Sequence, residues 1–214
     1  MILYTYFRSS AAYRVRIALN LKGLSYQSRS IHLLKDGGEQ NRADYLSINP
    51  QGLVPTLIDG EHALTQSMAI IEYLDERYPD PPLLPGSAEE RCKLRALANI
   101  VACYIHPLNN LRVLRYLKKD LACAEEQRQS WYQYWIAQGM AAMETFLNVV
   151  PVREKFCFAN RPSLADLCLV PQVYNAERNQ CDMTPYPRIQ SIYDNCMQFE
   201  TFQQAAPEQQ TDAE

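Results

Sequence analysis

Two adjacent serines near the start of the chain stand where a strand-like segment gives way to a helical one. Ser9 and Ser10 follow residues 2–6, a β-branched and aromatic run typical of a strand, and precede a helical pattern that ends at Gly23. Serine is a favoured N-cap residue, and the free N–H groups of a first helical turn stabilise an anion. The sequence therefore predicts an anion-stabilising helix start at this pair of serines.

Gln66 and Ser67 mark a second helix start of the same kind. They precede an apolar helical pattern that ends by Tyr78, and Ser67 is the expected N-cap. Capping of its own helix is the simpler explanation for any one of these serines. Two serine-led helix starts in one domain are nevertheless what an anionic ligand with more than one charged end would use.

Cysteine and histidine are distributed in a way that argues against a disulfide framework and against a metal site. The seven cysteines begin at Cys92, so residues 1–91 contain none, and no Cys-x-x-Cys pair occurs. The three histidines, His32, His62 and His106, are too scattered to suggest a ligand set. If the N-terminal half does thiol chemistry, we expect another molecule to supply the thiol.

Bulk composition excludes several classes of partner. The 214 residues carry a net charge of −3, which argues against nucleic acid and against an anionic membrane surface. No apolar run approaches the roughly 20 residues of a membrane span, and the N-terminus lacks the shape of a signal peptide. We therefore expect a cytoplasmic protein that acts on a small molecule, with any anion site confined to one locality.

The expected elements divide the chain into an α/β part and an all-helical part. Strand and helix patterns alternate as βαβαββα over residues 1–80, a proline-rich linker covers 81–86, and helical periodicity fills 87–214. The last residues, from Ala205 onward, are rich in polar side chains and are expected to form a frayed tail.

Three prolines interrupt these patterns. Pro55 lies in the third expected strand, where it marks either an edge strand or bulge, or a cis bond that turns the Val54 backbone toward a ligand. The sequence is compatible with both interpretations. Pro107 and Pro171 lie inside helical patterns and are expected to break or kink them.

Several polar and charged residues are expected to have a structural role rather than a catalytic one. Arg14 and Arg16 are expected to be solvated or salt-bridged rather than catalytic. Ser163 and Asp166 form a helix-capping signature, with the acidic residue three positions after the serine.

This organisation resembles the cytosolic glutathione transferases, and short motifs narrow the resemblance to their zeta class. Residues 9–18 are similar to the zeta-class motif Ser-Ser-Cys-x-Trp-Arg-Val-Arg-Ile-Ala, and matches also occur at 35–40, 66–67 and 175–178. The family resembled is that of maleylacetoacetate isomerase, with the bacterial maleylpyruvate isomerases close beside it. The resemblance implies a thioredoxin-like glutathione-binding domain, a helical substrate-binding domain and a homodimer.

The resemblance also implies roles for individual residues. Ser9 and Ser10 would face the sulfur of glutathione, and Val54 would pair with its cysteinyl backbone. The other implied contacts are Gln66 and Ser67 for the γ-glutamyl end, Gln40 and Gln51 for the glycyl end, Arg8 and Arg178 for the substrate carboxylates, and His106, Asn109, Asn110 and Arg112 as further substrate lining.

The chain departs from the class motif at two positions. Ala11 stands where the class has cysteine, and Tyr13 stands where it has tryptophan. We interpret Ala11 as the loss of an auxiliary thiol, because the isomerases act through the glutathione thiolate and the serine pair is retained.

The implied activity is glutathione-dependent cis-trans isomerisation of a small anionic diacid or keto acid, namely maleylacetoacetate to fumarylacetoacetate. A nucleophile that adds to the double bond, permits rotation and leaves again would provide the route. The alternatives are maleylpyruvate isomerisation, transferase activity on small electrophiles such as α-haloacids, and a noncatalytic glutathione-transferase-like scaffold.

Overall fold

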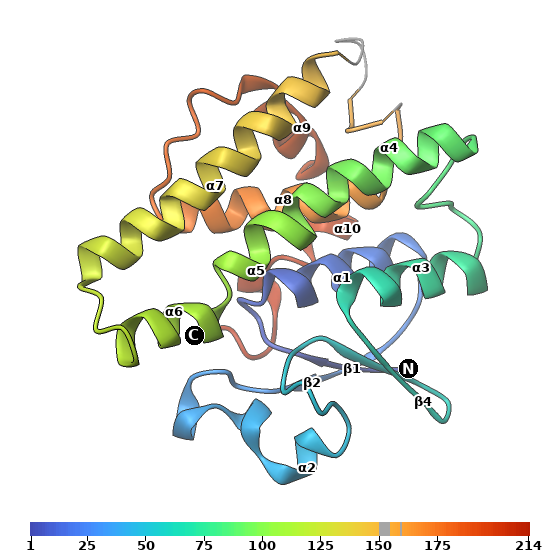
Figure 1. Cartoon of the computed structure of the whole chain (residues 1–214). Coiled ribbons are helices and arrows are strands. Elements are labelled where there is room, and N and C mark those ends of the chain that lie inside the picture. The colour runs from blue at the N-terminus through green and yellow to red at the C-terminus, as the bar shows by residue number, and fades with distance from the viewer. Residues whose placement is uncertain (150–154, 159) are drawn as a thin grey trace. The chain divides into compact units, whose positions relative to one another are not determined.

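The computed structural model describes residues 1–149, 155–158 and 160–214 (Figure 1). The chain forms two compact units, one of residues Met1–Leu83 with Met197–Glu214 and one of residues Leu84–Cys196. The expected helical domain over 87–214 differs from this division at its end, because the last 18 residues, 197–214, belong to the first unit.

The first unit is built on a four-stranded sheet of order β2-β1-β3-β4. Strand β1 pairs in parallel with β2 and antiparallel with β3, and β3 forms an antiparallel hairpin with β4. Leu3 lies opposite Leu57 in this register, and both side chains are fully buried. The strands are β1 (Ile2–Thr5), β2 (Gln27–Ser30), β3 (Thr56–Asp59) and β4 (His62–Thr65).

Helices cover this sheet within the first unit. Helix α1 packs against α3, and their fully buried side chains include Ile17, Ile70 and Leu74. Figure 1 shows these two helices together, with α2 on the opposite side of the sheet. The helices, with two 3₁₀ turns, are α1 (Ser10–Leu21), η1 (Lys35–Gly37), η2 (Glu39–Asn41), α2 (Ala43–Leu46) and α3 (Ser67–Arg77). The predicted order βαβαββα is therefore confirmed.

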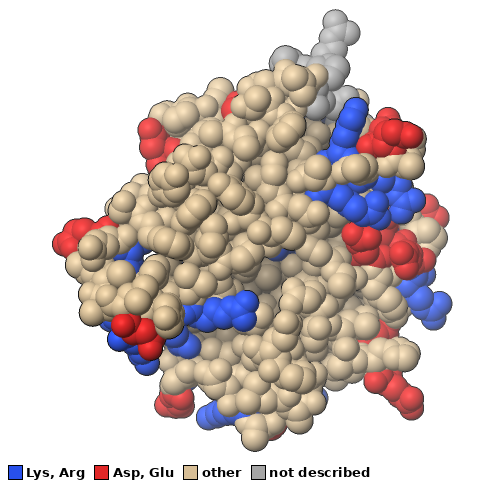
Figure 2. Space-filling view, viewed as in Figure 1, with Lys and Arg blue, Asp and Glu red and all other residues tan. Residues whose placement is uncertain are grey.

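The second unit contains no strand among its described residues. Helix α8 is its most buried helix, and α4 and α9 both pack against it. Figure 2 shows acidic and basic side chains mainly around the edge of the visible face, whose middle carries few charged side chains. The helices are α4 (Ala88–Asn99), η3 (Ile100–Ile105, a π-helix), α5 (His106–Leu108), α6 (Leu111–Lys119), α7 (Glu125–Asn148), α8 (Leu164–Arg178) and α9 (Pro187–Cys196).

The start of α8 is a buried capping box, as the sequence predicted. Asp166 accepts hydrogen bonds from the N–H and the hydroxyl of Ser163 and, through its other oxygen, from the N–H of Cys157. Burial raises the pKa of the Asp166 carboxyl, and these hydrogen bonds oppose the rise. The helix continues through Pro171, where the sequence pattern predicted a break or kink.

The expectation of a frayed tail from Ala205 is wrong. Helix α10 (Glu200–Gln203) contacts α1, the 3₁₀ turn η4 (Pro207–Gln209) follows, and Ala205 and Pro207 are buried. The prediction rested on the polar composition of the tail, but its alanine and proline residues are small enough to be buried where the tail packs closely. Within the described parts of the chain, no helix has both the length and the apolar character needed to cross a membrane.

Candidate active site

Three predicted site residues lie where β1 leads into α1: Arg8 and Ser9 in the turn, and Ser10 as the first residue of the helix. Ser9 is the N-cap: its Oγ accepts a hydrogen bond from the Ala12 N–H at 3.2 Å, and its own N–H donates to the Tyr6 carbonyl at 2.9 Å. Because Oγ acts as an acceptor here, the Ser9 O–H can still donate to a ligand. The first turn of α1 contains no acidic residue, so the positive end of the helix is not neutralised from within that turn.

Arg8 is a half-buried cation beside this turn. Its guanidinium carbon lies 4.6 Å from the centre of the Phe7 ring, and its Nε is buried with no hydrogen-bond partner among the described residues. Burial raises the pKa of the neighbouring Tyr6 hydroxyl, and the positive charge of Arg8 opposes that rise. Arg8 therefore retains a buried donor that a bound anion can satisfy.

The peptide bond between Val54 and Pro55 is cis, so this part of the second interpretation is confirmed, while the contact of the Val54 backbone with a ligand stays a prediction. The loop before it is held by side chains of the first unit. Tyr45 Oη donates to the Leu53 carbonyl at 2.6 Å, and Asn49 Nδ2 donates to the same oxygen at 2.8 Å. This loop therefore has a defined position immediately before β3.

Gln66, rather than the predicted Ser67, is the N-cap of α3. Its backbone φ of 68° is left-handed, which is a costly conformation for a residue with a side chain and is concentrated at functional sites. Its Nε2 donates to Gln51 Oε1 at 2.6 Å, so two residues predicted for opposite ends of one ligand are in contact.

Ser67 is instead the first residue of α3, and its Oγ accepts a hydrogen bond from Arg14 Nη1 at 3.3 Å. Arg14 is only 2% exposed, so of its two expected environments, solvated or salt-bridged, the solvated one is wrong. Arg16 is fully buried as well, and the hydrogen bonds it makes go to uncharged oxygens. The missed signal is that both arginines lie inside an otherwise apolar run, 12–19, whose every residue is buried.

Gln40, predicted for the glycyl end of glutathione, is buried in the first unit. Its Nε2 lies 3.5 Å from the Leu33 carbonyl, and its Oε1 is buried without a hydrogen-bond partner among the described residues. Gly38 makes room for it, because a Cβ at that position would lie 2.5 Å from Gln40 Nε2. A ligand that donates a hydrogen bond to this buried oxygen would remove the cost of leaving it unsatisfied.

In the second unit, a chain of hydrogen bonds joins two of the predicted substrate residues. Arg178, exposed at the end of α8, donates to Asn175 Oδ1 at 3.4 Å, and Asn175 Nδ2 donates to the Tyr132 hydroxyl at 2.5 Å. Asn109 Nδ2 donates to the Tyr132 carbonyl at 3.0 Å. Sequence reasoning missed Tyr132, which looks like one more apolar position on α7.

The remaining predicted lining residues lie at the junction of α5 and α6. His106 begins α5 and is half-buried. Asn110 is the N-cap of α6, and its Oδ1 accepts a hydrogen bond from the Arg112 N–H at 3.1 Å. The Asn110 side chain therefore has a capping role, whereas the Arg112 side chain is exposed.

Comparisons with known proteins agree with this arrangement. Residues 3–82 match the model of the glutathione S-transferase N-terminal domain. The chain is 53% identical to a probable maleylacetoacetate isomerase of Vibrio cholerae over 213 residues, which is 100% of this chain and 98% of that protein. The holo structure of a maleylpyruvate isomerase, described as a bacterial zeta-class transferase, superposes with a TM-score of 0.97 at 46% identity and covers 100% of both chains. The chain belongs to the zeta-class glutathione transferases.

A third comparison concerns a bound ligand. The maleylacetoacetate isomerase of Anaeromyxobacter dehalogenans was solved with dicarboxyethyl glutathione and citrate in its active site. It is 39% identical to this transferase, with a TM-score of 0.85, and the match covers 99% of this chain and 96% of that one.

The first unit of this zeta-class transferase contains no cysteine, and the structure describes that unit completely. Ala11 lies half-buried in the first turn of α1, at the position where the class motif has cysteine. All seven cysteines lie in the second unit, where each is a free thiol. A thiol that reacts at the start of α1 therefore does not come from the first unit itself.

Proposed function

We propose that this zeta-class transferase converts maleylacetoacetate to fumarylacetoacetate, with glutathione as its cofactor. The observation that carries the proposal is the serine-capped start of α1 in a unit without cysteine, combined with full-length similarity to isomerases. Such a helix start favours a thiolate but supplies none. Maleylpyruvate is the alternative substrate, because it presents the same conjugated, carboxylated double bond.

Residues of the first unit fit glutathione. The tripeptide carries a thiol, a glycyl carboxylate and a γ-glutamyl group with charges of both signs. The first unit offers N–H groups and two hydroxyls at the start of α1 and the polar pair of Gln51 and Gln66. It also offers a buried acceptor at Gln40 that has no hydrogen-bond partner among the described residues. The first unit therefore supplies hydrogen-bond donors and acceptors for this ligand and contains no cysteine of its own.

Each contact is assigned by its chemistry. Ser9 and Ser10 donate hydrogen bonds to the sulfur, and Val54 pairs through its backbone with the cysteinyl residue. Ser67 and Gln66 hold the γ-glutamyl end, where Arg14 fixes the Ser67 hydroxyl from behind. The glycyl end is held by Gln40 and Gln51.

When bound, glutathione supplies a thiolate that adds to the substrate double bond, permits rotation and is then expelled. The helix start and the serine hydroxyls lower the pKa of the bound thiol, because they stabilise its anion. Arg8 and Arg178 bind the substrate carboxylates and stabilise the negative charge that develops on the substrate during addition. The relay through Asn175 and Tyr132 orients Arg178 for this role.

His106, Asn109, Asn110 and Arg112 complete the proposal as substrate lining in the second unit. Asn109 is the best supported of them, because its Oδ1 is buried without a hydrogen-bond partner among the described residues. We also propose that the protein is a cytoplasmic homodimer. Seven free thiols fit a reducing compartment.

The deciding experiment follows the ultraviolet absorbance of maleylacetoacetate and of maleylpyruvate with and without glutathione. We expect conversion only with glutathione, and the faster substrate identifies the physiological one. Substituting both Arg8→Ala and Arg178→Ala should lower kcat/KM by about 100-fold or more, since each removes a charge-assisted contact. Arg91→Ala, at an exposed position on α4, is the matched control. Activity without glutathione would refute the proposed mechanism, and full activity of the double variant would refute the substrate site.

A further inference from the structure

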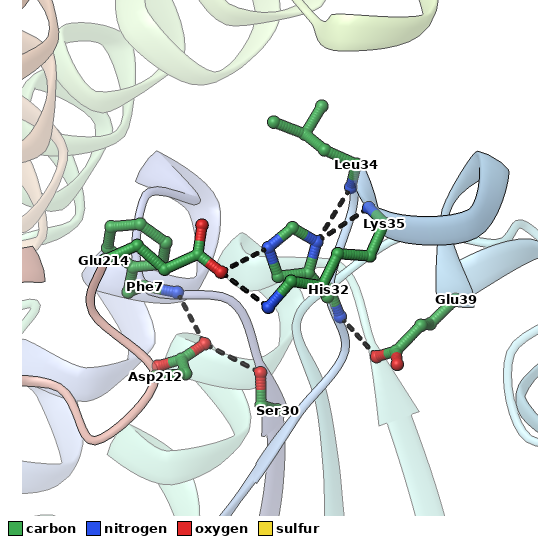
Figure 3. Close-up of polar contacts among 8 residues, drawn as sticks. All are labelled: Phe7, Ser30, His32, Leu34, Lys35, Glu39, Asp212 and Glu214. Atoms are coloured by element: carbon green, nitrogen blue, oxygen red, sulfur yellow. Dashed lines mark hydrogen bonds and ion pairs between the residues drawn. The ribbon is translucent and has the colours of Figure 1, made fainter.

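The last residues of the chain place two carboxylates within the first unit, Asp212 against the loop that precedes α1 and Glu214 against the segment that follows β2 (Figure 3). Asp212 Oδ2 accepts hydrogen bonds from the Phe7 N–H at 3.1 Å and from the Ser30 hydroxyl at 2.8 Å. Glu214 Oε1 lies 2.7 Å from Lys35 Nζ and 3.2 Å from His32 Nε2. Residues more than 180 positions apart in the sequence therefore meet here, and Asp212 joins the backbone before Arg8 to the end of β2.

Phe7 is held on both sides of its backbone. Its N–H donates to Asp212, and its carbonyl accepts a hydrogen bond from Arg16 Nη2 at 3.0 Å. The same buried guanidinium donates from Nε to the Ala205 carbonyl at 2.9 Å and reaches the Tyr6 carbonyl at 3.4 Å. Arg16 and the C-terminal segment thus fix the backbone immediately before the predicted catalytic residues.

His32 extends this network to the other side of the loop. Its Nδ1 accepts hydrogen bonds from the N–H groups of Leu34 and Lys35, at 3.2 and 2.8 Å, so the proton of the neutral ring lies on Nε2 and is donated to Glu214. The His32 ring packs edge-on against Tyr6, with 5.0 Å between ring centres. Glu214 therefore holds a ring that supports the end of β1.

We propose that Asp212 is a positioning residue for the β1–α1 turn, and that it thereby controls how strongly the turn stabilises a thiolate. The inference rests on the proposed use of glutathione. Asp212 does not touch the sulfur in this scheme. It fixes the Phe7 peptide, and through it the direction of Arg8, Ser9 and the first N–H groups of α1.

The charge and the hydrogen bond of Asp212 predict opposite effects on the bound thiol. A carboxylate near the thiolate disfavours it, so removing the charge alone would lower the pKa of the thiol. Loss of the acceptor instead frees the Phe7 peptide, disorders the helix start and raises the pKa of the thiol. The sign of the change therefore distinguishes positioning from electrostatics.

The test compares Asp212→Ala with Asp212→Asn in the full-length protein. The alanine variant loses the acceptor, whereas asparagine keeps an oxygen for the Phe7 N–H and loses only the charge. Glu200→Gln is the control, because Glu200 is an exposed acid on the same segment that bonds Gln204 instead of the turn. The thiolate absorbance of bound glutathione is titrated against pH, and kcat, KM and thermal unfolding are measured alongside.

For Asp212→Ala we expect the titration of the bound thiol to move to higher pH and kcat to fall roughly tenfold, because small misplacements of reacting groups are costly. Asp212→Asn should retain most of the activity, with its thiol titration unchanged or moved to lower pH. The proposal is overturned if the alanine variant titrates like the wild type or at lower pH, whatever its stability. The titration requires only glutathione binding, so it remains informative even if neither substrate is isomerised.

Discussion

The start of α1 and the end of α8 both present predicted catalytic side chains, but they are supported in different ways. The turn before α1 is fixed through its backbone, by Arg16, by Asp212 and by the Ser9 cap. Arg178 at the end of α8 is exposed, and its guanidinium donates a hydrogen bond of 3.4 Å to the Asn175 side chain. A turn that is fixed through its backbone presents its hydrogen-bond donors in one geometry. An exposed arginine side chain can change its conformation.

This difference suits the two proposed ligands. Glutathione is invariant and its thiol must meet fixed N–H and O–H donors, so preorganisation lowers the cost of stabilising the anion. The proposed substrate changes shape between its cis and trans forms, and an exposed arginine has room to follow its carboxylate. We therefore expect substitutions in the first region to act on the thiol, and substitutions in the second region to act on substrate recognition.

The largest effect is expected at the start of α1. Replacing both Ser9 and Ser10 with alanine should lower kcat by about 100-fold, because donors to a developing anion are removed. Ser9→Ala alone should also lower the free energy of unfolding by about 1 kcal/mol through loss of the N-cap.

Ser87→Ala is the matched control for the double serine variant. Ser87 caps α4 in the same way, so its loss should destabilise the protein to a similar degree and leave kcat unchanged. Denaturant unfolding and steady-state kinetics measure the two effects separately. A double variant with wild-type kcat would remove the serines from the mechanism.

A smaller effect is expected for Arg178→Lys. Lysine keeps the charge but loses the planar fork, so KM for the substrate should rise about tenfold while the affinity for glutathione stays the same. Initial rates over a range of both concentrations check this. A change confined to glutathione affinity would contradict the assignment of Arg178 to the substrate.

Local patterns predicted most of the fold, and the class motif is the source of the proposed glutathione contacts. The order of strands and helices along the first unit, the Ser9 cap and the Asp166 capping box each depend on residues near one another in sequence. The residues that support the β1–α1 turn could not be predicted from local patterns. Arg16 finds its partner at Ala205, and Asp212 finds Phe7, across almost the whole chain.

The incorrect predictions for individual residues have one physical cause. Arg14, Arg16 and Asp212 are charged, and sequence patterns assign charge to the surface. Each of them instead bonds a specific partner, the two arginines in the core and Asp212 at the β1–α1 turn. Only the tertiary structure shows which charged side chains have such partners.

The smallest expected effect tests the relay behind Arg178. Tyr132→Phe removes the hydroxyl that accepts from Asn175, so kcat/KM should fall only a few-fold, in line with the loss of about 1 kcal/mol from one hydrogen bond. Glutathione affinity should not change. Tyr186→Phe, a similarly buried tyrosine whose hydroxyl donates to the Ala137 carbonyl, is the control.

The same variant has a signature in the pH dependence of stability. Burial raises the pKa of the Tyr132 hydroxyl above its ordinary value, so above about pH 10 the unfolded chain loses this proton while the folded protein keeps it. The unfolded state then binds fewer protons, and the free energy of unfolding falls as the pH rises. Tyr132→Phe should make that fall shallower in denaturant titrations above pH 10. An unchanged slope would mean that Tyr132 ionises as readily in the folded protein as in the unfolded chain, and the relay to Arg178 would then lack its buried anchor.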